Sequence, residues 1–73
     1  ELDKAETAFK AALAYNENEF TTPSIMVKLA LVYEATGNIE KAIETFESVK
    51  KDYPKSGELN NVEKSLARLN QEL

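Results

Sequence analysis

The same spacing of apolar residues occurs twice along this chain. The first set is spaced three, four and three positions apart, as on the apolar face of an amphipathic helix: Leu2, Ala5, Phe9 and Ala12. A second set follows 37 positions later at the same intervals: Ile39, Ala42, Phe46 and Val49. The polar residues between them do not repeat in step, so a packing requirement explains the repeat better than a shared surface site. A repeat of this length indicates helical units that stack side by side.

A different kind of helix is predicted between the two sets. Residues 24–36 are apolar on most sides, which is typical of a helix enclosed by other helices. Thr22 is expected to cap this helix, with Pro23 at its first helical position. Gly37 is expected to end it in the left-handed conformation, after which Asn38 can cap the next helix.

The two helices that follow are predicted to differ in how much of their surface is apolar. The third helix is expected to run to about Asp52, because the residue before Pro54 avoids the helical region. A fourth helix is expected over residues 58–73, with one narrow apolar stripe: Leu59, Val62, Leu66, Leu69 and Leu73. One apolar edge on an otherwise polar helix suits the end of a stack, where only one side has a neighbour.

These residues resemble the tetratricopeptide repeat, a helix–turn–helix unit of about 34 residues with the pattern W-x2-L-G-x2-Y, A-x3-F and P. The match reads Met26-x2-Leu29-Ala30-x2-Tyr33, Gly37, Ala42-x3-Phe46 and Pro54. Met26 stands for the large aromatic residue and Ala30 for the small glycine. The resemblance implies an all-α fold, an antiparallel helix–turn–helix solenoid of about four helices in a right-handed superhelical stack.

The resemblance also predicts how a single domain over residues 1–73 is organised. Residues 1–16 correspond to the second helix of a partial repeat, residues 23–56 to one full repeat, and residues 58–73 to a C-terminal capping helix. The chain is therefore expected to be the C-terminal part of a longer repeat protein.

The composition excludes most chemistry. Because the chain has no cysteine and no histidine, it lacks the thiolate nucleophile, the commonest general base and the usual zinc ligands. A net charge of −4 with a single arginine argues against nucleic acid as a partner. The longest apolar run, Leu29 to Tyr33, is too short to span a membrane, so no membrane insertion is expected. We expect no catalytic residue, no cofactor and no metal site.

Two acidic segments are interpreted as solvated surface. Glu40, Glu44 and Glu47 lie opposite the apolar face of their helix, whereas an acid–base pair would need one carboxyl group out of water. The segment Asn16–Glu19 lacks the alternating acidic pattern and the distant bidentate glutamate of a calcium loop.

The resemblance implies a binding surface on residues 24–36. In tetratricopeptide arrays one side of the first helix lines a concave groove in which peptides or partner segments dock. Here that side carries Ser24, Val27, Lys28, Leu31 and Glu34. The apolar pair favours a hydrophobic or helical ligand, so we predict a protein–protein interaction scaffold with a protein or peptide partner. Two alternatives stay open: Val27 and Leu31 pack on a neighbouring helix, or the chain is a purely structural cap without a ligand.

The first helix is expected to leave apolar surface uncovered. Phe9 can face residues 24–36, whereas Ala8, Leu13 and Tyr15 are expected to turn towards the place of a missing neighbouring helix, and the Val27/Leu31 stripe is expected to lie next to that gap. Apolar patches of this kind usually mark association, and two-fold pairing is the commonest closed arrangement. We therefore predict a homodimer through the N-terminal end.

The compartment stays open between the cytoplasm and the bacterial periplasm. No targeting segment is recognised in the chain, and Tyr53-Pro54-Lys55-Ser56 resembles repeats of bacterial envelope-assembly proteins.

Overall fold

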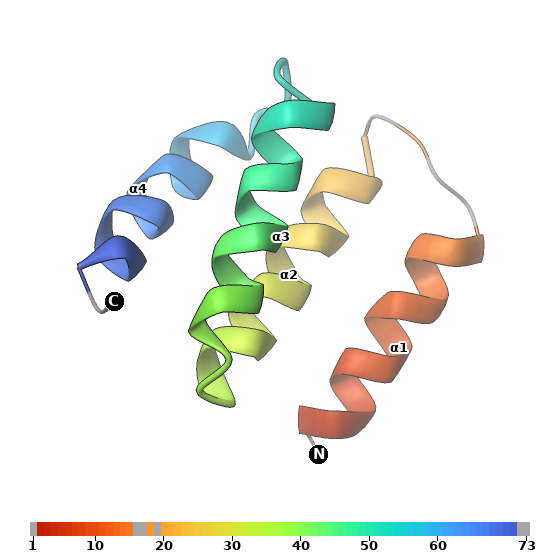
Figure 1. Ribbon diagram of the computed structural model, residues 1–73. Coiled ribbons are helices and arrows are strands. Elements are labelled where there is room, and N and C mark those ends of the chain that lie inside the picture. The colour runs from red at the N-terminus through yellow and green to blue at the C-terminus, as the bar shows by residue number, and fades with distance from the viewer. Residues whose placement is uncertain (1, 16–17, 19, 72–73) are drawn as a thin grey trace.

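The computed structural model describes residues 2–15, 18 and 20–71, and these residues form four helices without a strand (Figure 1). The helices are α1 (Leu2–Tyr15), α2 (Thr22–Ala35), α3 (Ile39–Asp52) and α4 (Leu59–Asn70). Each helix packs on the next one in chain order, so α2 lies between α1 and α3, and α3 lies between α2 and α4. The predicted all-α arrangement of helical hairpins is confirmed.

The core lies where α2, α3 and α4 meet. Its buried members come from all three helices: Leu29, Ala30, Tyr33, Ala42, Ile43, Phe46, Val49, Val62, Leu66 and Leu69. Phe9 and Leu13 of α1 pack against this cluster but stay partly exposed. The two copies of the sequence repeat are therefore not equally enclosed, since Phe46 is 0% exposed and its counterpart Phe9 is only half-buried.

The turn from α2 to α3 follows the prediction from Gly37. This glycine has a φ of 86°, in the left-handed region that residues with a side chain rarely adopt. The N–H of Gly37 donates to the carbonyl of Glu34 at 3.1 Å, and the N–H of Asn38 donates to that of Tyr33 at 2.8 Å. These two bonds form a Schellman motif, which satisfies carbonyls at the end of the helix.

The start of α2 differs from the prediction. The helix begins at Thr22, one residue early, and Thr21 rather than Thr22 is its N-cap. Thr22 is buried, and its hydroxyl oxygen accepts a hydrogen bond from the N–H of Asn18 at 2.8 Å. The Asn18 Oδ1 atom accepts from the N–H groups of Phe20 and Thr21, both at 2.8 Å. The side chain of Asn18 thus holds the turn that precedes α2, whereas the N-cap residue Thr21 makes no side-chain capping bond.

The fourth helix carries the predicted apolar edge. Val62, Leu66 and Leu69 are buried, and Leu59 packs against the core from the first turn. The fifth member of the stripe, Leu73, lies outside the described residues, as do residues 16, 17 and 19 of the segment considered as a calcium loop. Among the described residues, α4 is therefore buried along one edge, as expected for the last layer of a stack.

Candidate partner-binding groove

The structure places the five predicted groove residues on the side of α2 opposite its buried face. Leu31 is 46% exposed and Lys28 is exposed, whereas Ser24 and Val27 are half-buried. Val27 also packs against the core. Val27 and Leu31 are four residues apart and so lie on neighbouring turns of one helix face. Leu31 is thus the exposed apolar residue on this side of α2. Val27 lies one turn before it, and its side chain is packed partly against the core.

The fifth predicted residue, Glu34, is joined to α4. Arg68 Nη1 donates to Glu34 Oε2, and Arg68 Nη2 donates to Glu34 Oε1 at 3.1 Å. This bidentate pairing suits the planar guanidinium group, which holds a carboxylate through two parallel bonds. Because Arg68 is half-exposed and Glu34 is 23% exposed in their side chains, water screens the pair and its effect on stability is modest.

The ion pair joins one member of the predicted set, Glu34, to α4. Sequence reasoning assigned Glu34 to partner binding but did not find Arg68. The two residues are 34 positions apart, so no helical spacing connects them. One signal for this pair was present in the sequence, because Arg68 is the single arginine of the chain and stands among the polar residues of the fourth helix.

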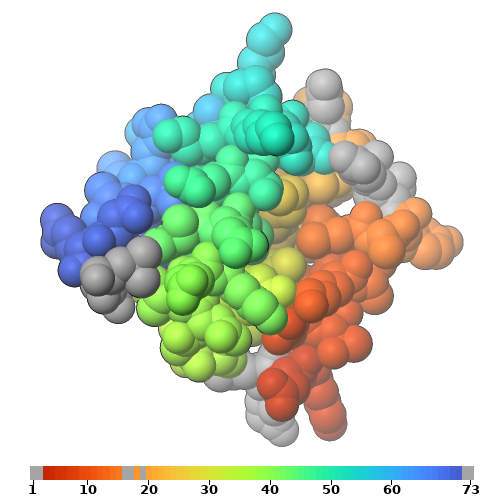
Figure 2. All heavy atoms as spheres, viewed as in Figure 1, coloured from red at the N-terminus to blue at the C-terminus, as the bar shows by residue number. Residues whose placement is uncertain are grey.

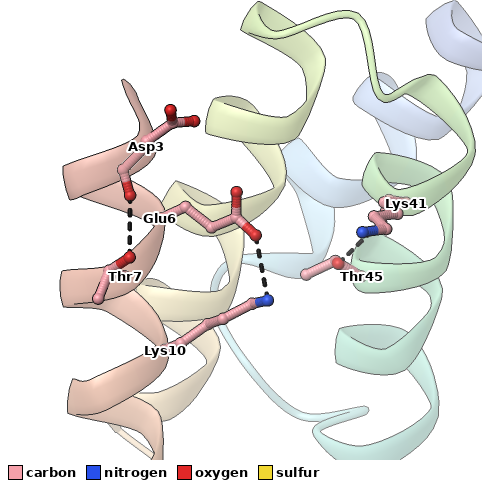
Figure 3. Close-up of polar contacts among 6 residues, drawn as sticks. All are labelled: Asp3, Glu6, Thr7, Lys10, Lys41 and Thr45. Atoms are coloured by element: carbon pink, nitrogen blue, oxygen red, sulfur yellow. Dashed lines mark hydrogen bonds and ion pairs between the residues drawn. The ribbon is translucent and has the colours of Figure 1, made fainter. Parts of the chain in front are cut away.

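A second polar cluster joins α1 to the repeat (Figure 3). Lys10 Nζ lies 3.0 Å from Glu6 Oε2 on the next turn of α1. The ammonium groups of Lys10 and Lys41 lie 6.0 and 5.7 Å from the centre of the Tyr33 ring, within the range of cation–π attraction. Residues from α1, α2 and α3 therefore meet at this point.

The hydrogen bond and the nearby charges in this cluster favour the ionised forms of Glu6 and Lys10. The hydrogen bond from Lys10 lowers the pKa of the Glu6 carboxyl below 4.5, with Tyr33 and Lys41 acting in the same direction. The same hydrogen bond, with a contribution from Tyr33, raises the pKa of the Lys10 ammonium above 10.5. Both shifts in pKa favour the charged forms of the two side chains. The cluster acts as a polar contact between helices.

The three glutamates on α3 agree with their interpretation as solvated surface. Glu40, Glu44 and Glu47 are all exposed on α3. Within the described ranges, no group of three or more acidic, histidine or cysteine side chains is placed to hold a metal ion. None of the four helices, over the part of the chain that is described, combines the length and apolarity needed to cross a bilayer.

The outer side of α1 is only partly as predicted. Ala8 is exposed and Tyr15 is 91% exposed, but Leu13 packs against the core instead of turning outward. Leu13 follows Phe9 by four positions, which puts both side chains on the face of α1 that meets α2. Sequence reasoning also missed Phe20, which is 87% exposed just before α2.

Comparison with known protein families gives one match to this chain. A family model described as a tetratricopeptide repeat matches residues 25–56. The matched segment contains nearly all of α2, the Gly37 turn, α3 and the start of the connection to α4. Comparisons with curated proteins and with solved structures found no match.

Proposed function

We propose that the chain binds a partner segment through the predicted groove side of α2, because residues 25–56 match a tetratricopeptide-repeat family model and repeats of this family generally mediate protein–protein interaction. The observation that supports this site is Leu31, which is 46% exposed on a helix whose other large apolar residues are buried or half-buried. Ser24 and Lys28 give this leucine a polar border. An accessible apolar residue with a polar rim is the usual centre of a protein interface.

The surroundings of Leu31 define the chemistry of the proposed partner. Leu31 offers a contact for one apolar side chain, while the Glu34–Arg68 pair at 3.1 Å presents a charged edge beside it. This combination suits the amphipathic face of a helix or short peptide. Nucleic acid is not proposed as a partner, since the net charge is −4 and the single arginine is held by Glu34.

A glutamate at position 31 is expected to weaken partner binding. Peptides selected from a displayed library against the wild-type chain should lose about tenfold or more in affinity for Leu31→Glu, because a buried apolar contact is replaced by a charge. The melting temperature should change little, since Leu31 is 46% exposed. Lys51→Glu, which places a glutamate on the exposed side of α3, is the matched control. Selected peptides that bind Leu31→Glu and wild type equally would contradict the site.

The alternative proposal is a purely structural role. In it α1 completes a partial repeat, residues 23–56 form the full repeat, and α4 caps the stack without binding a ligand. The burial of α4 along one edge, at Val62, Leu66 and Leu69, supports this alternative. A library selection that yields no peptide for the wild-type chain would favour the cap over the groove.

A second copy of the chain is a further proposed partner, through the N-terminal end. Ala5, Phe9 and Ala12 of α1 are half-buried, whereas their counterparts Ala42, Phe46 and Val49 on α3 are all 0% exposed. The nearby Tyr15 is 91% exposed. This incomplete enclosure supports pairing of two copies, which would cover both α1 surfaces.

Self-association is expected to depend on concentration and on Leu31. Sedimentation equilibrium should show dimers of the wild type at several hundred micromolar, as an order of magnitude for weak pairing, and fewer dimers of Leu31→Glu, because the added charge opposes apolar contact. Lys51→Glu should associate as the wild type does. A wild type that stays monomeric would contradict the dimer, and equal association of Leu31→Glu would place the interface elsewhere.

A further inference from the structure

A cavity of about 590 Å³ lies beside the two connections that join α1 to α2 and α3 to α4. Figure 1 shows both connections at the same end of the helices, away from the Gly37 turn. Phe20 lines the cavity from the first connection. The end of α3 and the second connection supply the rest of the lining: Asp52, Tyr53, Pro54, Lys55, Ser56, Gly57 and Glu58. The volume of the cavity is within the range of ligand sites in proteins, roughly 300–1,000 Å³.

The cavity has aromatic side chains on both connections. Phe20 is 87% exposed, yet its backbone is held in place because its N–H donates to Asn18 Oδ1 at 2.8 Å. Tyr53 is half-buried at the end of α3, and its carbonyl accepts a hydrogen bond from the N–H of Ser56 at 3.0 Å. Aromatic surface is therefore presented by two residues whose own backbone groups are hydrogen-bonded, which lowers the entropic cost of binding.

The charge of the lining is negative. Asp52 and Glu58 contribute two carboxylates, and Lys55 contributes one ammonium group. The N–H of Glu58 donates to Ser56 Oγ at 3.0 Å, so this acidic residue sits on the same fixed turn as the aromatic Tyr53. Carboxylates and aromatic residues that line one cavity offer the two kinds of contact that a planar cation uses, ion pairing at its edge and stacking on its face.

We propose that this cavity binds the arginine side chain of a partner protein. The guanidinium group stacks on Phe20 and donates hydrogen bonds to the carboxylate of Asp52 or Glu58. Arginine fits better than lysine, because its cation is flat, weakly hydrated and able to hold a carboxylate through two bonds. The site is separate from the Leu31 surface and does not depend on the groove proposal.

The proposal is tested with a blocked tripeptide, acetyl-Ala-Arg-Ala-amide, followed by amide NMR shifts of the intact chain. Shifts should concentrate at residues 20 and 52–58, with a dissociation constant on the order of millimolar, as expected for a ligand of this size. The same peptide with citrulline keeps the shape but loses the charge, and should bind about tenfold or more weakly. Equal binding of the two peptides, shifts confined to α2 and α4, or no shift at tens of millimolar would overturn the proposal.

Two variants are expected to change the affinity for the arginine peptide in opposite directions. Phe20→Ala should weaken arginine binding by about fivefold, because the stacking surface is lost. Lys55→Ala should strengthen it about twofold or more, because a like charge is removed from the lining. Tyr15→Ala is the matched control, since Tyr15 is 91% exposed but does not line the cavity. Binding that responds equally to Phe20→Ala and Tyr15→Ala would show that exposed aromatic surface, and not this cavity, takes up the peptide.

Discussion

Replacing Phe46 by alanine is expected to lower the melting temperature by about 15 °C or more. Phe46 is 0% exposed at the centre of the cluster shared by α2, α3 and α4. Removing a buried phenylalanine ring typically costs about 3–5 kcal/mol, and a chain of this size has roughly 4–11 kcal/mol of stability in total. Each kilocalorie corresponds to about 4–8 °C in a small domain. A thermal melt followed by circular dichroism measures the loss.

The other two phenylalanines of the chain, Phe9 and Phe20, serve as controls for this prediction. Phe9 is the counterpart of Phe46 in the first copy of the repeat and is half-buried, so Phe9→Ala should cost less. Phe20 is 87% exposed, and Phe20→Ala should change stability by no more than about 0.5 kcal/mol. The expected order of the three losses is Phe46, then Phe9, then Phe20. Equal losses at Phe46 and Phe9 would mean that α1 is as well enclosed as α3.

Helix positions were largely predictable because their signals are local. The spacing of Ala42 and Phe46 defines the buried face of α3, and Gly37 has the positive φ that its place after a helix indicated. The helix ends at Asp52, two residues before Pro54, as predicted. Each of these features depends on residues within a few positions of one another, so the sequence alone contains the information.

The beginning of α2 was less predictable because several residues there are able to cap a helix. Asn18, Thr21 and Thr22 each have a side-chain oxygen suited to the role. Burial decides between them, since Thr22 is 4% exposed and its hydroxyl is bonded to the N–H of Asn18. The space-filling view shows the atoms of neighbouring helices lying against one another on this face (Figure 2), and the burial of Thr22 is likewise a property of the tertiary packing.

The candidate site was predictable only where it follows helix periodicity. Spacing predicted which residues share this side of α2, and Leu31 on that side is 46% exposed, whereas its assignment as a groove came from the family resemblance. The ion pair of Glu34 with Arg68 of α4 was not found, because the two residues lie on different helices, beyond the three- and four-residue spacings that relate neighbours on one helix. The cavity beside Phe20 was missed for the same reason, since its walls come from two connections that meet only in the folded chain.

Replacing Ala42 by leucine is expected to lower the melting temperature by about 5–20 °C. Ala42 is 0% exposed and lies in the core cluster between α3 and α2. The tetratricopeptide pattern places a small residue here, where two helices meet closely. Three added carbon atoms have to displace packed neighbours, and overpacking of this kind typically costs about 1–3 kcal/mol, which is converted at about 4–8 °C per kcal/mol.

The matched variant is Ala5→Leu, at the equivalent position of α1. Ala5 is only half-buried, so a larger side chain there has room to turn toward solvent and should cost clearly less than Ala42→Leu. Circular-dichroism melts of the two variants and the wild type, under one condition, give the comparison. An Ala42→Leu melt that coincides with the wild type would show that α2 and α3 do not approach closely at this residue, which contradicts the repeat packing on which the placement of the groove depends.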